Sequence, residues 1–101
     1  MNQLCIVGRL TKEPTWEVIT IAVNRNYKNE EGVYETDFID VLLSKSIAQN
    51  VAEYCRKGDL IGIKGRLENR DIDDGDGHMI HRNMIVVADK VTFLSSRNGG
   101  E

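Results

Sequence analysis

Residues 61–70, IGIKGRLENR, alternate strictly between two kinds of residue, and this alternation limits the fold more than any other feature of the chain. Every second residue from Ile61 to Leu67 is apolar or glycine, whereas the residues between them are glycine or charged. A period of two is typical of a β-strand with one buried and one solvated face. The sequence therefore predicts a strand over residues 59–70, whose solvated face carries these charged residues: Lys64, Arg66, Glu68 and Arg70.

Further segments have the composition of β-strands. They are QLCIVGRL (3–10), VITIAVNRN (18–26), YETDFIDVLLS (34–44) and IHRNMIVVADKVTFL (80–94), the last as one long strand or two short ones. In residues 34–44, alternation places Ile39, Val41 and Leu43 in the core and leaves Phe38 on the outer face. The core does not need an outward phenylalanine, so base stacking or a contact between subunits would explain it.

Residues 44–58, SKSIAQNVAEYCRKG, have helical periodicity. Residues three or four apart share one face of a helix, and we expect this apolar set to enter the core: Ile47, Val51, Tyr54 and Cys55. Ser46 and Gln49 have the spacing of a capping box at the start of the helix. Arg56 complements the dipole at its C-terminal end, and Gly58 suits the position just past that end.

The order of the predicted elements, three strands, a helix and two strands, is that of an OB-fold. We therefore expect an all-β domain with one helix: a five-stranded Greek-key barrel with the helix between strands three and four. Residues 1–95 would form this domain, and residues 96–101 a short, flexible, polar C-terminus. OB-folds bind oligonucleotides or oligosaccharides on their second and third strands and the neighbouring loops.

Charge is sorted by segment along the chain. The net charge of −3 argues weakly against a nucleic-acid partner. Residues 29–44 contain acids and no base, bases outnumber acids over residues 45–70, and a run of aspartates follows in residues 71–76. Because the bases are grouped, a local basic surface is compatible with the acidic total.

The sequence disfavours catalytic, metal-binding and membrane proteins. Its histidines and cysteines form no set of nucleophile and base, so we expect neither an enzyme nor a cofactor. The following aspartates do not match a calcium loop, so we expect a solvated hairpin turn and no metal site: Asp71, Asp73, Asp74 and Asp76. No apolar run approaches the ~18 residues of a membrane span. We expect a soluble, cytoplasmic protein in which Cys5 and Cys55 are buried, reduced thiols.

The chain contains VGRLTKEP, ITIAVNRNY, DFIDVLL and VAEYCRKGDLIGIKGRLENR, in this order. Together these segments resemble the bacterial single-stranded DNA-binding protein family, and the likeness extends from about Asn2 to Leu94. The resemblance implies an OB-fold and a homotetramer built from two dimers. It also implies sequence-tolerant binding and protection of single-stranded DNA in replication, recombination or repair, by a protein associated with the nucleoid.

The resemblance implies which residues contact DNA. Tyr27 and Phe38 match positions where the family carries stacking aromatics, and Trp16 is a further aromatic that could add to them. We expect these cations to contact phosphates: Arg9, Arg25, Lys28, Lys45, Lys64, Arg66 and Arg70. Alternate residues of a strand repeat about every 7 Å, so the cations of residues 64–70 form a candidate phosphate path. The alternative is a solvated strand face on which Glu68 pairs with its neighbours.

The chain departs from the family in several places. Ser44 and Ile72 stand where aromatics are usual, and the run of aspartates lies in a loop that reaches DNA in the family. The sequence ends soon after its last predicted strand, so we expect no recruitment of repair or replication enzymes by a C-terminal tail. These departures leave a second reading open: an OB-fold protein-interaction module of replication restart with weak DNA binding.

Overall fold

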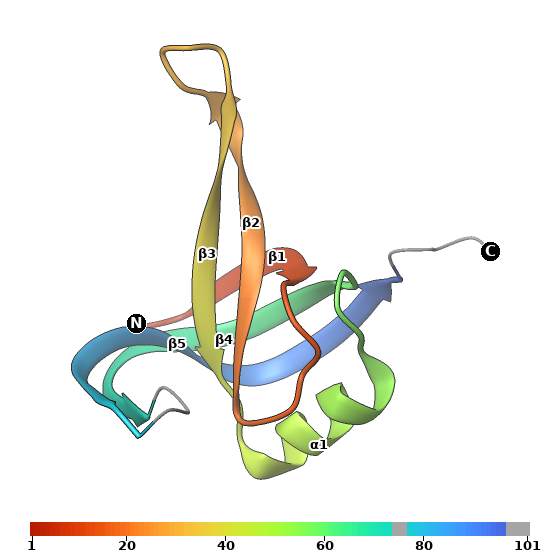
Figure 1. The fold of residues 1–101 in the computed structure, drawn as a ribbon, viewed down its shortest axis with the longest axis vertical. Helices are drawn as coiled ribbons and strands as arrows, with labels where there is room; N and C mark the ends of the chain where they lie inside the picture. The colour runs from red at the N-terminus through yellow and green to blue at the C-terminus, as the bar shows by residue number, and fades with distance from the viewer. Residues whose placement is uncertain (74–76, 97–101) are drawn as a thin grey trace.

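The structure, a computed structural model, describes residues 1–73 and 77–96. Its elements follow the expected order: β1 (Leu4–Leu10), β2 (Val18–Lys28), β3 (Tyr34–Leu42), α1 (Lys45–Tyr54), β4 (Leu60–Asp73) and β5 (Met79–Ser95). The strands form a closed barrel in the order β1-β2-β3-β5-β4, and pairing of β1 with β4 completes it (Figure 1). The expected OB-fold, with its helix between β3 and β4, is confirmed.

One parallel pairing joins the first three strands to the last two. Val41 of β3 lies opposite Val86 of β5, whereas the other strand pairs are antiparallel. A parallel pair needs a long crossover, which α1 and β4 supply. Strand β5 is one strand of 17 residues, which decides between the two readings of this segment. Its pairing with β4 shifts register at irregular positions, and such bulges let a strand bend around a barrel.

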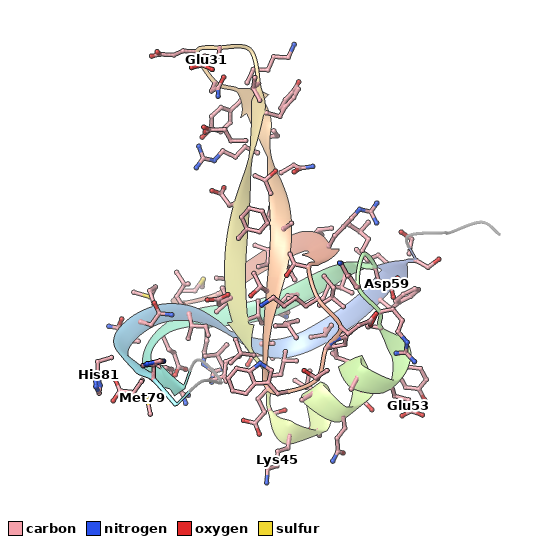
Figure 2. The ribbon with its side chains drawn as sticks, viewed as in Figure 1. Glu31, Lys45, Glu53, Asp59, Met79 and His81 are labelled. Carbon is pink, nitrogen blue, oxygen red and sulfur yellow. The ribbon has the colours of Figure 1, made fainter. Side chains whose placement is uncertain are left out.

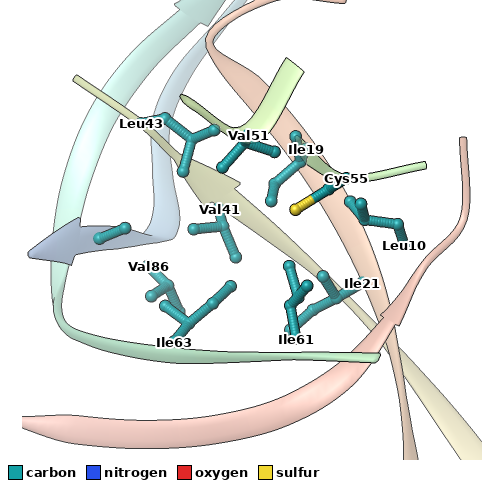
Figure 3. Packing of buried hydrophobic residues seen from close by; sticks show 11 residues of the cluster. Leu10, Ile19, Ile21, Val41, Leu43, Val51, Cys55, Ile61, Ile63 and Val86 are labelled. Atoms are coloured by element: carbon teal, nitrogen blue, oxygen red, sulfur yellow. The ribbon is translucent and has the colours of Figure 1, made fainter. Parts of the chain in front are cut away.

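The core is built from the alternate residues that the sequence assigned to buried faces. Figure 3 shows inward side chains of β2, β3 and β4 meeting Val51 of α1 and Cys55, the residue that caps the C-terminal end of this helix. The fully buried members are isoleucines and a valine: Ile21, Ile61, Ile63, Ile85 and Val41. β-branched side chains of this kind pack well on a pleated surface, so the sequence pattern and the core agree.

Helix α1 begins at a different serine from the one expected. Ser44 is the N-cap, since its backbone is extended and its Oγ accepts a hydrogen bond from the backbone N–H of Ile47 at 3.4 Å. The capping box assigned to Ser46 is therefore wrong. Tyr54 is also not in the core: it is 68% exposed, because it lies at the edge of the face centred on Val51. No helix in the described part of the chain is long and apolar enough to cross a membrane.

The C-terminal end of α1 is stabilised as expected. The Arg56 guanidinium donates hydrogen bonds to the carbonyl oxygens of Ala52 (3.0 Å) and Cys55 (2.8 Å). Gly58 follows with a φ of +91°, in the left-handed region that favours glycine. Its backbone N–H donates to the carbonyl oxygen of Leu10, and this ties the end of the helix to β1.

Two residues expected to be buried are exposed. Leu67 is 43% exposed because the pairing of β1 with β4 ends at Gly65, so no strand covers it. Cys5 alternates with Leu4 and Ile6, which pack against the core, and so its thiol faces outward. Cys55 is buried as expected, and burial raises the pKa of its thiol.

The hairpin that joins β4 and β5 also differs from its prediction. Strand β4 continues to Asp73, so Asp71 and Asp73 belong to a strand rather than to a turn. The backbone of Asp73 lies opposite that of Met79. Asp74 and Asp76 lie outside the described residues, as do residues 97–101 of the expected C-terminal segment.

Candidate nucleic-acid interface

The hairpin of β2 and β3 extends away from the barrel (Figure 1). We call residues 22–38 the arm, because beyond the Ala22–Phe38 pair the described residues of these strands pair only with each other. Glu31 marks its tip (Figure 2). The Asn29 side-chain oxygen accepts hydrogen bonds there from the backbone N–H groups of Glu31 and Val33, and Gly32 has a φ of +79°. The arm is therefore an ordered element with a defined turn.

The outer face of the arm carries aromatic and uncharged polar groups with one lysine. Strand register places Ala22 opposite Phe38, Asn24 opposite Thr36 and Lys28 opposite Tyr34, and alternation along β3 puts all three pairs on one face. The Thr36 hydroxyl donates to the Asn24 side-chain oxygen at 2.7 Å. Phe38 is 69% exposed because its neighbour Ala22 is too small to cover it. The expected outward orientation of Phe38 is confirmed.

The opposite, inner face of the arm carries an ion-pair cluster. The Arg25 guanidinium donates two hydrogen bonds to the Asp37 carboxylate, at 2.9 and 3.1 Å, and one to Glu35 at 2.7 Å. The hydrogen bond from Arg25 lowers the pKa of the Asp37 carboxyl, and the Asp37 carboxylate in turn raises the pKa of Arg25. The positive charge of Arg25 is thus shared between two acids of its own hairpin.

Two of the three cations predicted to line β4 are paired in the same way. Arg66 contacts the carboxylates of Glu68 and Asp89, and Arg70 contacts Glu68 at 2.8 Å. Hydrogen bonds from both arginines lower the pKa of the Glu68 carboxyl. This is the pairing by Glu68 that the sequence left open. Lys64 has no ion pair within residues 1–73 and 77–96, and the equally exposed Lys90 lies opposite it on β5.

Arg9 lies in line with Phe38 across the sheet. The register pairs Arg9 of β1 with Ala22 of β2, and Ala22 with Phe38 of β3. All three lie on the outer side of the barrel wall, and two strand spacings of ~4.8 Å put the cation about 10 Å from the aromatic residue along this row. Arg9 also donates to the carbonyl oxygen of Gly58 at 3.0 Å. The structure therefore brings to one surface an exposed aromatic ring and a guanidinium that has no ion pair within the described residues.

Trp16 and Lys45 form a separate group. They line a hollow of about 360 Å³ against α1, together with Ala48, Gln49 and Ala52. Figure 2 shows Lys45 at the opposite end of the molecule from Glu31 at the tip of the arm. The structure thus does not gather Trp16 and Lys45 with Tyr27 and Lys28.

Sequence reasoning missed one exposed aromatic residue of the arm. Tyr34 is 55% exposed, much like Tyr27, and the Lys28 ammonium lies 5.7 Å from the centre of its ring. The alternation that identified Phe38 as outward also identifies Tyr34, four residues before it on the same strand. Among the described residues, no group of three or more histidine, cysteine, aspartate or glutamate side chains could hold a metal ion.

Comparison with known proteins shows which family the chain is related to. The sequence model of the single-strand binding protein family matches residues 1–94. The chain belongs to this family. The single-strand binding protein family is one of binding proteins rather than enzymes, and the comparisons do not favour the alternative of a protein-interaction module.

Similar curated proteins include a single-stranded DNA-binding protein of Bacillus cereus, 40% identical over 109 aligned positions. That alignment covers 99% of this chain and 64% of the relative, so the chain spans less than two thirds of its length. Single-stranded DNA-binding protein B of Bacillus subtilis is 36% identical, with 95% of this chain and 92% of that protein covered.

Solved structures support the fold. The small single-stranded DNA-binding protein of Streptomyces coelicolor matches with a TM-score of 0.68 and 21% identity, over 93% of this chain and 95% of that one. A deletion mutant of the single-stranded DNA-binding protein of Thermus aquaticus matches with a TM-score of 0.73 and 24% identity, over 98% of this chain and 53% of that one.

Ser44 has a structural role in this chain. Ser44 stands where the family resemblance places a ring, and here it caps α1. The N-cap needs a small side chain with an oxygen that reaches a backbone N–H group, which an aromatic side chain lacks. Ser44 therefore contributes a contact that stabilises the start of the helix.

Proposed function

We propose that this chain binds single-stranded DNA with little sequence preference and protects it in replication, recombination or repair. The observation that supports this most directly is Phe38, an exposed ring on the outer face of the arm beside the small Ala22 and in line with Arg9. Single strands are held by aromatic rings on which bases stack and by cations that follow the backbone. The arm and the neighbouring barrel wall supply both.

In this proposal Phe38 and Tyr27 stack on bases, and the cations without carboxylate partners contact phosphates first. Among the cations predicted to contact phosphates, those without a carboxylate partner within the described residues are Arg9, Lys28, Lys45 and Lys64. Arg66 and Arg70 also contribute, because a guanidinium has five N–H donors and can keep its carboxylate while donating to a phosphate. Arg25 attracts the DNA phosphates less strongly, because it forms ion pairs with two carboxylates. Trp16 and Lys45 would contact a DNA strand that continues past the base of the arm toward α1.

We propose further that the protein acts without catalysis in the cytoplasm, on the nucleoid, as a homotetramer made of two dimers. Exposed apolar groups on the outer side of β1, β4 and β5 support self-association. Val7 is half exposed and lies opposite Gly62, and the Leu94 side chain lies over the same glycine. Sedimentation equilibrium tests this point, and the mass of a single chain at micromolar concentration would contradict it.

The proposed activity is tested by fluorescence anisotropy of a labelled oligo-dT about 35 nucleotides long at two salt concentrations, with a duplex of the same length as control. We expect tight binding of the single strand that weakens as salt rises, because neutralised phosphates release counterions. Binding of the duplex should be much weaker. Failure to bind oligo-dT at tens of micromolar protein would contradict the proposal.

A further inference from the structure

Tyr34 is an exposed aromatic residue that the family resemblance did not assign to DNA. It lies at the first position of β3, opposite Lys28 of β2, near the tip of the arm. Its ring is 55% exposed and packs against no residue of the barrel core. The ring is not needed for folding of the barrel, so it is available to contact a ligand.

The position of Tyr34 continues the row that begins at Phe38. Phe38, Thr36 and Tyr34 alternate along β3 and therefore share the outer face of the arm. Four residues of an antiparallel strand span about 14 Å, so the two rings are platforms separated by that distance. Neighbouring nucleotides of a B-form strand are only ~3.4 Å apart, so the two rings would take bases that are not adjacent.

Lys28 makes this position suitable for a nucleotide. Its ammonium lies 5.7 Å from the centre of the Tyr34 ring, within the range of a cation–π contact. A lysine placed there orients the ring and stands within reach of the phosphate attached to a stacked base. No carboxylate among the described residues pairs with Lys28, so its charge is available.

Two acids of the arm, Glu35 and Asp37, lie on its other face, whereas Glu30 and Glu31 lie in the turn at its tip. Glu35 and Asp37 alternate with the outer residues of β3, and Arg25 holds both of them on the inner face. The repulsion that these two carboxylates exert on phosphates is therefore strongest on the face of the arm opposite Tyr34. An arm with several acids therefore still offers one face that a polyanion can approach.

We propose that Tyr34, oriented by Lys28, is a base-stacking residue of this chain that extends the platform of Phe38 toward the tip of the arm. This inference rests on the proposed binding of single-stranded DNA.

The first test compares Tyr34→Ala and Tyr34→Phe by anisotropy titration of oligo-dT. Loss of one stacked base corresponds to about fivefold to 150-fold weaker binding, and we expect Tyr34→Ala in this range. Tyr34→Phe keeps the ring and should bind within about twofold of the wild type. The salt dependence should stay unchanged, because no charge is removed. The matched control is Tyr54→Ala, which removes an even more exposed tyrosine from α1 and should have no effect.

A second test uses the unaltered protein. An oligo-dT in which some thymines are replaced by 5-iodouracil is irradiated in the complex, and mass spectrometry locates the crosslinked residue. A crosslink at Tyr34 supports the proposal. Crosslinks at Tyr27 or Phe38 without one at Tyr34, together with wild-type affinity of Tyr34→Ala, would overturn it and leave the proposed function standing. No binding by the wild type would overturn both.

Discussion

At the scale of single residues, ion pairs decide which cations of the interface keep a charge available for DNA. Arg25, Arg66 and Arg70 each contact carboxylates of neighbouring strand positions, whereas Lys64 and Arg9 have no carboxylate partner within the described residues. Exposed pairs of this kind contribute little to stability, and salt screens them. Their main consequence here is to lower the local positive potential without removing the guanidinium donors.

The Arg25 pair leads to a prediction about pH. Arg25 holds the pKa of the Asp37 carboxyl below its ordinary value of ~3.9, so the pair stabilises the arm above that pH. The contribution is lost as the pH falls through the lower pKa of the folded state, because the carboxylate is then protonated. We expect Arg25→Ala to return the pKa of Asp37 toward its ordinary value, as measured by NMR titration of the carboxyl carbon.

Lys28→Ala is the control for this titration, because Lys28 contacts Tyr34 rather than Asp37. It should leave the pKa of Asp37 where it is in the wild type. Equal pKa values of Asp37 in the wild type and in Arg25→Ala would show that the ion pair does not form in solution.

At the scale of elements, two glycines of β4 make opposite predictions. A Cβ at Gly65 would lie 2.2 Å from the backbone oxygen of Val87, at the bulge between β4 and β5. A Cβ at Gly62 would meet the Leu94 side chain at 3.6 Å and the backbone oxygen of Thr92 at 4.0 Å, both ordinary contacts. Gly65→Ala must move one strand of the barrel and should cost roughly 1–3 kcal/mol, a fall in Tm of about 5 °C or more.

Thermal unfolding followed by circular dichroism measures this difference. Gly62→Ala, on the same strand and three residues earlier, should unfold within about 2 °C of the wild type. A Tm of Gly65→Ala equal to that of Gly62→Ala would contradict the close approach of β4 and β5.

The strands and the helix could be predicted because each repeats a local pattern over many residues. The alternation of Ile61 and Ile63, for example, needs no knowledge of the partner strand. The start of α1 could not be fixed in this way, because Ser44 and Ser46 both offer an oxygen and the end of β3 decides between them. Leu67 was predicted to be buried but is exposed, and the reason is similar: whether its side chain is covered depends on where β1 ends.

The candidate site was predictable only in part. The outward position of Phe38 follows from alternation, and the same rule would have identified Tyr34. The pairing of Arg25 with Asp37 and of Arg66 with Asp89 depends on strand register, which a single sequence does not state. Trp16 lies on the segment before β2 and Lys45 begins α1, so their separation from the arm depends on where the helix packs and was not visible in the pattern.

At the scale of the whole molecule, an acidic protein becomes compatible with a polyanionic ligand by separating its charges. The arm keeps Glu35 and Asp37 on one face and the rings of Phe38 and Tyr34 on the other. Arg9, Lys64 and Lys90, which have no carboxylate partner within the described residues, lie on the strands of the barrel wall. The total charge therefore predicts the partner less well than the distribution of charge over faces does.

Stacking on the outer face of the arm is the central claim, and Phe38→Ala tests it most directly. Oligo-dT affinity of the wild type and the variant would be measured by anisotropy at several salt concentrations, with thermal unfolding to show that the variant is folded. We predict binding weaker by about fivefold to 150-fold, with parallel lines in a plot of log affinity against log salt concentration. Affinity of a folded Phe38→Ala within twofold of the wild type would contradict the claim.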